Sequence, residues 1–260
     1  MVDEKSVKKF EYHLTGKIIP ERVDFSTTIP PIRIAVPEYG FDFTVALSII
    51  KSHVSIKIES ENEIQDYETL RNTVVEYVRM YTDSYGYLNG FAYGVEITSF
   101  SGSNNKPYVV FGVDISALKN SDRPFHEIGD ILPLMWEFDE LRIVLGDLRR
   151  SMEYPNDTAL FCYRAIEGIM QFFMEGDSKD NSVRKNAWES MRNNLNISES
   201  WIKEKFEKLS IPSRHAKRVS LTGKMRENMM NDAWKVVDRF IVFLKNDQHN
   251  LDKNKFLELK

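Results

Sequence analysis

The sequence predicts an α+β protein in which a mainly antiparallel sheet with one helix precedes an all-helical bundle. In the first half of the chain, apolar side chains alternate with polar ones, which is typical of strands that bury one face. In the second half they recur every three or four residues, as in helices that bury one side. A polar segment, 119–124, separates the two patterns. We therefore expect two domains, residues 1–122 and 123–260.

Alternating apolar residues mark three early strands, at 10–14, 41–49 and 54–58. Lys51 and Ser52 lie between the second and third of these strands, so we expect a hairpin turn there. Between the first two strands, Pro30 and Pro31 are adjacent. Proline cannot donate a backbone hydrogen bond, so this stretch fits an edge strand or an extended connection better than a central strand.

Helical spacing over residues 64–84 predicts one helix that crosses the sheet. Two more strands follow at 91–97 and 109–113, and the Ser- and Asn-rich segment 101–105 between them predicts a turn. The economical arrangement is a sheet of about six mainly antiparallel strands that is covered by this single helix.

The second half predicts five helices, at 136–152, 156–174, 182–193, from 198 onward, and 223–244. The helix at 156–174 is apolar nearly all round, which places it at the centre of the bundle. Ser198 is a candidate N-cap with Ile197 and Ile202 placed to form a hydrophobic staple. Residues beyond Asn246 are polar and are expected to fray. Three tryptophans are interpreted as bundle packing: Trp188, Trp201 and Trp234.

Composition excludes several classes of protein. No stretch approaches the roughly 18 apolar residues that cross a bilayer, and the first ten residues lack the apolar core of a signal peptide, so we expect a cytoplasmic protein without membrane contact. The single cysteine, Cys162, cannot form an internal disulfide and is interpreted as a buried structural thiol. Residues 1–130 carry 19 acidic and 13 basic side chains, whereas 201–226 carry eight basic and two acidic ones. That basic segment attracts phosphate or forms a solvated face.

Known catalytic motifs are missing from the sequence. It contains neither GxxxxGK[ST] nor GxGxxG, and GxSxG is also absent. The five histidines are scattered, and no Cys/His set has the spacing of a zinc site. We therefore expect no cofactor and no metal.

The most informative polar cluster is the segment 213–218, Ser-Arg-His-Ala-Lys-Arg, which is expected in the linker before the last helix. Arg214 offers a planar pair of donors to phosphate oxygens, and His215 can move protons at neutral pH. Such a pair can cleave a phosphodiester without a metal, with His215 as general acid or base and Arg214 stabilising the transition state. The alternative is a basic loop in which His215 caps a helix C-terminus.

A second cluster lies on the central helix, where Arg164 and Glu167 are three residues apart and therefore near each other on one face. One interpretation is an ion pair between them that fixes the packing of the bundle. The other is that Glu167 orients an arginine or histidine from residues 214–218.

The helical half resembles the HEPN (higher eukaryotes and prokaryotes nucleotide-binding) superfamily over roughly residues 134–246. The resemblance rests on the stretch Asp157–Glu167, DTALFCYRAIE, in an early helix and on Arg214-His215 just before a long terminal helix. Many members are metal-independent ribonucleases or RNA-binding modules in toxin, phage-defence and RNA-processing systems, and they often form dimers with a composite Arg-x4-6-His site. Here Arg214 and His215 are adjacent instead, so they and Glu167 are carried over only as positional analogues.

The leading functional hypothesis is therefore RNA or nucleotide binding by a dimeric helical half, with metal-independent RNase activity at Arg214, His215 and Glu167. Its candidate RNA contacts are Lys217, Arg218, Lys224 and Arg164. The N-terminal domain would serve as a sensor or as a docking module for a protein partner. The alternative is a non-catalytic dimeric interaction or ligand-sensing protein.

Overall fold

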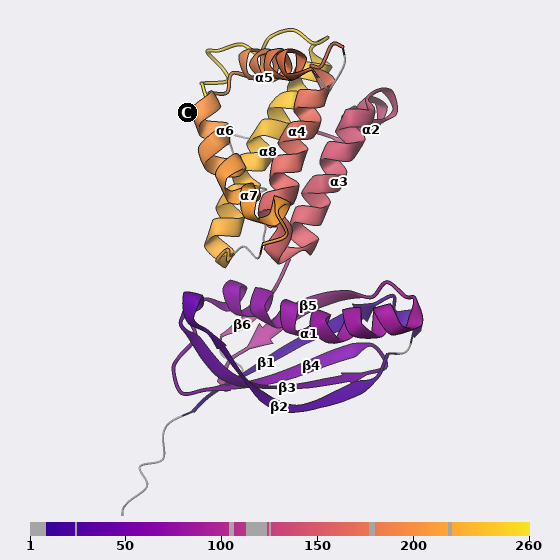
Figure 1. Ribbon diagram of the computed structural model, residues 1–260, viewed down its shortest axis with the longest axis vertical. Helices are drawn as coiled ribbons and strands as arrows, with labels where there is room; N and C mark the ends of the chain where they lie inside the picture. Colours follow the sequence, from indigo (N-terminus) through magenta and orange to yellow (C-terminus); the bar gives the residue numbers. More distant parts are fainter. Residues whose placement is uncertain are drawn as a thin grey trace, which may run out of the picture. The chain divides into compact units, whose positions relative to one another are not determined.

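An antiparallel sheet with one helix and a bundle of helices form the two halves of the chain in the computed structural model, so the predicted α+β class is confirmed (Figure 1). The chain divides into two compact units, Met1–Asp114 and Ile115–Lys260. The predicted boundary after residue 122 lies outside the described residues. The structure describes residues 9–23, 25–103, 107–112, 124, 126–176, 180–217 and 220–260.

Six strands form one sheet in the order β2-β3-β4-β1-β5-β6, and every neighbouring pair is antiparallel. The predicted turn at Lys51 and Ser52 is confirmed, and both residues have the positive φ that a tight hairpin requires. The strands are β1 (Phe10–Ile19), β2 (Thr27–Val36), β3 (Phe41–Ile50), β4 (His53–Ser60), β5 (Gly94–Ser101) and β6 (Tyr108–Val110).

The proline pair lies in an edge strand, as predicted. β2 is the outermost strand next to β3, and its pairing register shifts between Ile29 and Ile32, where Pro30 and Pro31 interrupt the ladder. β5 begins three residues later than expected and runs on to Ser101. The predicted strand at 109–113 is shorter and ends at Val110, while Val113 lies outside the described residues, as do Asn104 and Asn105 of the predicted turn.

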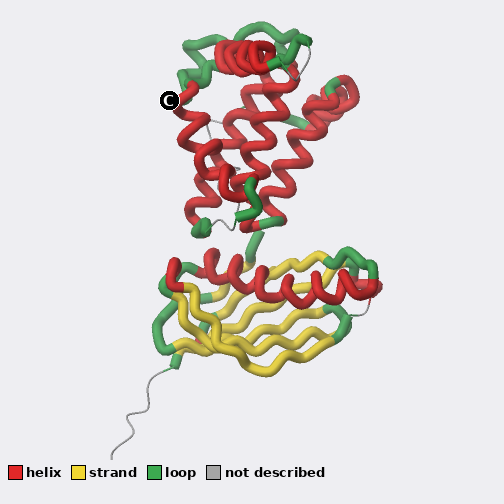
Figure 2. The backbone as a smooth tube through the Cα atoms, viewed as in Figure 1, coloured by secondary structure: helices red, strands yellow, loops and turns green. Residues whose placement is uncertain are grey.

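One helix, α1 (Tyr67–Asn89), crosses one face of the sheet (Figure 2). Asp66 caps its N-terminus by accepting a hydrogen bond from the backbone N–H of Thr69, and Gly90 ends it in the left-handed conformation. The helix buries Leu70, Val74 and other apolar residues against the sheet. Its partners there are the alternate side chains of the central strands, such as Leu14, Ile18, Val45, Leu47, Ile56 and Ile58.

The first helices of the helical unit differ from the prediction. The expected helix at 136–152 is two helices that meet at Phe138, because Phe138 has an extended backbone. The central helix is confirmed: α4 buries Cys162, Ile166 and Ile169 completely and packs on α3, α5, α7 and α8. Burial also raises the pKa of the Cys162 thiol to about 12. The helices are α2 (Ile128–Glu137), α3 (Asp139–Glu153), α4 (Thr158–Phe172), α5 (Asn181–Leu195), α6 (Glu199–Ile202), a π-helical turn (Lys203–Glu207), α7 (Lys208–Arg214) and α8 (Gly223–Lys245), with short 3-10 turns at Glu21–Val23, Pro37–Tyr39 and Pro155–Asp157.

The segment after Ser198 is one continuous helical stretch through α6, the π-helical turn and α7. The N-cap is confirmed, since the Ser198 hydroxyl accepts from the N–H of Trp201. Residues 213–218 were expected in a linker, but α7 runs through Pro212 to Arg214 and places Arg214 on a helix.

The C-terminal segment packs on the bundle, so the prediction of fraying beyond Asn246 is wrong. Leu251 is buried, and Leu259 forms a parallel bridge with Ile197. The backbone of Leu259 donates to the carbonyl of Asn196 (3.1 Å) and accepts from the N–H of Ser198 (2.9 Å). A few apolar side chains within a polar run are enough to hold the segment, because the connection between α5 and α6 offers unpaired backbone groups.

Arg239 of α8 forms hydrogen bonds with both the C-terminal segment and the connection between α5 and α6. Its guanidinium donates to the carbonyls of Leu195 (2.9 Å), Asn196 (2.7 Å) and Leu257 (2.5 Å). Burial lowers the pKa of Arg239 to about 10, so the side chain is still charged at neutral pH. One cation therefore ties the end of α5 to the C-terminal segment.

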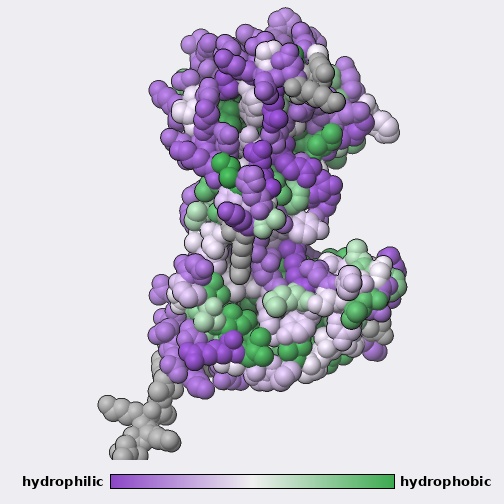
Figure 3. Space-filling model, in the orientation of Figure 1, coloured by the Kyte–Doolittle hydropathy of each residue, from purple (hydrophilic) through white to green (hydrophobic). Residues whose placement is uncertain are grey.

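Surface hydropathy differs between the two units. On the face in Figure 3 the helical unit is mainly hydrophilic, whereas the N-terminal unit shows hydrophobic next to hydrophilic surface. Exposed apolar side chains include Tyr87, Leu88 and Phe91 at the end of α1. Of the described helices, none combines the length and apolar character needed to cross a membrane.

Replacing Gly16 by Ala should destabilise the sheet. Gly16 lies where the pairing of β1 with β5 shifts register, and an added Cβ would overlap the carbonyl oxygen of Glu96. We expect Gly16→Ala to lower the free energy of unfolding by about 1–3 kcal/mol in urea denaturation. Gly94→Ala is the control, since the atom nearest to its Cβ would be 3.6 Å away, and it should change stability by less than about 0.5 kcal/mol. Equal losses in the two variants would contradict this explanation.

Replacing Arg239 by Met should destabilise the helical unit, because three backbone carbonyls lose a donor. We expect a loss of about 2–3 kcal/mol in the free energy of unfolding. Lys235→Met, one turn earlier on α8, removes only the partly exposed ion pair with Asp232 and should cost at most about 1 kcal/mol. A loss for Arg239→Met no larger than that for Lys235→Met would argue against the proposed clamp.

Candidate functional site

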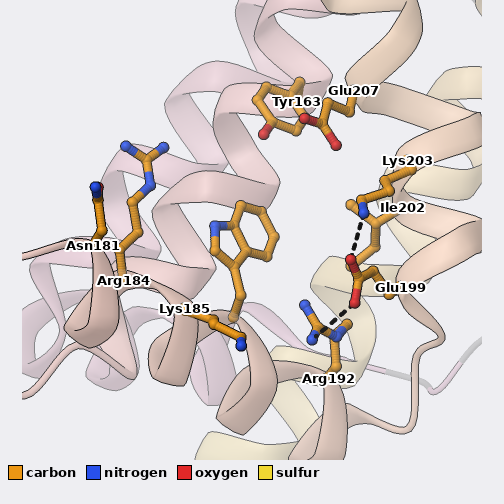
Figure 4. A pocket seen from close by; sticks show the side chains of 10 residues that line it. Tyr163, Asn181, Arg184, Lys185, Arg192, Glu199, Ile202, Lys203 and Glu207 are labelled. Atoms are coloured by element: carbon orange, nitrogen blue, oxygen red, sulfur yellow. Dashed lines mark ion pairs between the residues drawn. The ribbon is translucent and has the colours of Figure 1, made fainter.

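The helical unit contains a cavity of about 330 Å³ between α4, α5 and the stretch of α6 and the π-helical turn (Figure 4). Its volume is at the lower end of the range of small-molecule sites. The lining residues are Tyr163 of α4, Asn181, Arg184, Lys185, Trp188 and Arg192 of α5, Glu199 and Ile202 of α6, and Lys203 and Glu207 of the π-helical turn.

An aromatic pair forms one side of the cavity. Tyr163 is 5% exposed, and its ring lies nearly parallel to that of Trp188, with centroids 6.3 Å apart and an angle of 19° between the planes. The guanidinium of Arg214 lies 5.2 Å from the centroid of the Tyr163 ring, a cation–π distance. Tyr163 thus links the cavity with the end of α7.

Four cations line the cavity, and one carboxylate bridges two of them. Oε1 of Glu199 lies 2.5 Å from Nζ of Lys203, and Oε2 lies 3.4 Å from Nη2 of Arg192 (Figure 4). The hydrogen bond from Lys203, followed by the charge of Arg192, lowers the pKa of Glu199. Arg184 pairs with Glu167 on α4 at 2.8 Å, whereas Lys185 forms no ion pair within the described part of the chain. Cations therefore outnumber the lining carboxylates, Glu199 and Glu207.

The Tyr163 hydroxyl stays protonated at neutral pH. Burial is the main cause that raises the pKa of Tyr163 to about 12, and the negative charges of Glu167 and Glu207 raise it further against the opposing charges of Arg214 and Arg184. A protonated hydroxyl can donate a hydrogen bond to an anion.

The predicted residues Arg214 and Glu167 do not line the cavity, but each contacts a residue that does. Arg214 contacts Tyr163, and Glu167 holds Arg184. His215 follows Arg214 as the exposed C-cap of α7, and its backbone N–H donates to the carbonyls of Ile211 and Pro212. His215 thus ends the helix through its backbone, while its imidazole makes no hydrogen bond to a described residue.

The predicted ion pair between Arg164 and Glu167 is wrong. Arg164 instead lies 3.5 Å from the buried carboxylate of Asp147 on α3, while Glu167 pairs with Arg184 on α5. Three residues turn a helix by about 300°, so the two side chains diverge by roughly 60°. On a helix with neighbours on several sides, that difference directs them to different partners.

Of the remaining predicted contacts, Lys217 and Lys224 do not line the cavity. Lys224 pairs with Glu227 in the first turn of α8, and Lys217 is exposed after α7. Arg218 lies outside the described residues. Within the described ranges, no group of three or more His, Cys, Asp or Glu side chains is placed to hold a metal ion.

The residues of α5 that form the cavity were missed by sequence reasoning, although they carry a signal. Arg184, Trp188 and Arg192 are spaced by four residues and therefore lie on one helix face. Trp188 packs against the bundle core as predicted, and it also lines the cavity, while Trp201 is buried as expected. A cationic helix face with a tryptophan at its middle is the sequence pattern that could have revealed this site.

The comparisons with known proteins gave two matches to family models. Residues 12–111 match the domain of unknown function (DUF8168) N-terminal domain, and residues 128–245 match the domain of unknown function (DUF8168) C-terminal domain. A search of curated proteins and a search of solved structures found no match. Both matches are to DUF8168 domains, in their order along the chain, and together they span most of its length, so the two halves of the chain are similar to the two domains of DUF8168.

Proposed function

We propose that the helical unit is a HEPN-like bundle that binds RNA or a nucleotide in the cavity next to Tyr163 and Trp188. The observation that carries the proposal is an aromatic pair inside a cavity whose walls hold four cations. Bases stack on aromatic side chains whatever their sequence, and arginine and lysine bind phosphate. An anionic ligand with a flat ring system satisfies both features.

The arrangement of charges supports one nucleotide unit per cavity. Trp188 lies at the middle of the α5 face, with Arg184 and Lys185 before it and Arg192 after it in the sequence. A base stacked on the indole has its sugar and phosphate within one helical turn of a cation on either side. Because phosphate contacts release counterions, the affinity should fall as salt rises.

RNA cleavage at Arg214 and His215 is a separate proposal. Arg214 is held beside the cavity by the Tyr163 ring, and the exposed imidazole of His215 follows it directly. A cation that stabilises the transition state and a general acid or base beside it are what metal-independent phosphodiester cleavage requires. Glu167 acts indirectly in this scheme, since it pairs with Arg184.

Replacing Trp188 by Leu should weaken binding of a fluorescently labelled oligoribonucleotide, measured by anisotropy at low salt in EDTA. Loss of one stacking surface is worth about 1–3 kcal/mol, or roughly 5- to 150-fold in Kd. Tyr87→Leu removes an aromatic side chain that is 88% exposed on the other unit and should leave Kd unchanged. No salt-dependent binding by the wild-type chain, or equal binding by Trp188→Leu, would refute the proposed site.

The same reactions, resolved on a gel, test for cleavage. If Arg214 and His215 are catalytic, Arg214→Ala and His215→Ala should each abolish cleavage in EDTA. If the wild-type protein binds RNA and does not cleave it, the RNase proposal is wrong and the helical unit is an RNA-binding domain without this activity.

A second candidate function is a non-catalytic dimer, which an apolar stripe on α2 favours. Ile128, Leu132 and Trp136 are spaced by four residues, and Trp136 is 81% exposed. Exposed stripes of this kind mark interaction surfaces.

If the stripe joins two copies, light scattering should give a dimer for the wild-type chain and a monomer for Trp136→Asp. Arg149→Asp, on the exposed surface of α3, should leave the mass unchanged. A wild-type monomer would exclude this candidate.

A further inference from the structure

We infer that Glu199 is an internal competitor for the phosphate of the ligand, and that the site prefers a terminal phosphate monoester to an internal phosphodiester. This inference rests on the proposed function. Glu199 occupies, with its carboxylate, the position between Arg192 and Lys203 that a phosphate group would take.

The geometry of the carboxylate is that of a bound anion. Its two oxygens are divided between two cations from different walls of the cavity: Arg192 comes from α5, and Lys203 begins the π-helical turn. A phosphate group also offers several oxygens and can bridge the same two cations. Both cations are lining residues, so a ligand in the cavity reaches them directly.

Exposure makes the carboxylate easy to displace. The side chains of Glu199 and Lys203 are each 54% exposed, and ion pairs in such positions add little to stability. Glu199 lies in the first turn after Ser198, where its side chain can turn to water without disturbing the buried neighbours Trp201 and Ile202. The bridge is therefore better placed to control binding than to hold the fold together.

The charge balance favours a dianion. Lys185 adds its positive charge to those of Arg192 and Lys203 around Glu199. The other lining carboxylate, Glu207, lies beside Tyr163, away from Arg192 (Figure 4). An internal phosphodiester carries one negative charge and merely replaces that of Glu199. A phosphate monoester carries about 1.5–2 negative charges at neutral pH and also engages Lys185.

The test is calorimetric titration of the full chain with adenosine 5′-monophosphate. Glu199→Gln keeps the size of the side chain and removes its charge, so Kd should fall by about fivefold or more as the repulsion of the phosphate is lost. Adenosine, which has no phosphate, should bind both proteins equally. The control is Glu204→Gln, an exposed carboxylate on the same helical stretch that does not line the cavity and should leave Kd unchanged.

Two further kinds of ligand show whether the bound phosphate belongs to a phosphodiester, to an RNA end or to a free nucleotide. The dinucleotide adenylyl-adenosine has only an internal phosphodiester and should gain less from Glu199→Gln than the monophosphate does. An oligoribonucleotide with a 5′-phosphate should gain more than the same strand with a 5′-hydroxyl if RNA ends are the ligand, whereas a gain confined to adenosine 5′-monophosphate identifies a free nucleotide.

The outcomes distinguish this inference from the proposed function. If the wild-type chain binds nucleotide and Glu199→Gln binds it equally or more weakly, Glu199 supports the site and the inference is wrong. Equal gains for the phosphodiester and the monoester would overturn the preference for a terminal phosphate. If neither protein binds any of these ligands, the proposed function itself falls.

Discussion

The burial of α4 is the constraint on which the helical unit depends. Cys162, Ile166 and Ile169 are completely buried, and the helix is in contact with α3, α5, α7 and α8. A helix that is apolar nearly all round must be covered on several sides, which fixes where its neighbours lie. The few polar groups on α4 then reach outward between those neighbours, and Tyr163 and Glu167 do so where α5 and α7 approach. The candidate site is thus a consequence of how the core helix is covered.

The cavity wall is held by interactions outside the cavity. Arg192 and Glu199 lie on opposite sides of the connection between α5 and α6. That connection is fixed by Arg239, which donates to its carbonyls, and by the backbone pairing of Leu259 with Asn196 and Ser198. The last residues of the chain therefore help to set the distance between the two helices that carry the cations. Helices that are fixed in this way hold the backbone positions of Arg192 and Glu199 constant relative to each other.

Sequence patterns anticipated most of the fold and only part of the site. The strands at 41–49 and 54–58, the central helix and the last helix were predicted because alternation and helical spacing report directly which face is buried. The split at Phe138 and the docking of the C-terminal segment were not, because both depend on contacts between residues distant in sequence. The chemistry of Arg214 and His215 marks that cluster in the sequence, yet the cavity lies on the other side of the Tyr163 contact and takes half of its lining residues from α5, whose tryptophan also packs on the core.

The sequence by itself determined the α+β class, the order of a sheet followed by a bundle, and the identity of the helix at its centre. These follow from local periodicity, which one stretch of chain carries alone. Only the tertiary structure decided the partners of the charged residues: that Arg164 meets Asp147, that Glu167 meets Arg184, and that Glu199 bridges Arg192 and Lys203. An ion pair depends on the distance and direction between two side chains, and those are set by how helices pack against one another, which no single segment of the sequence contains.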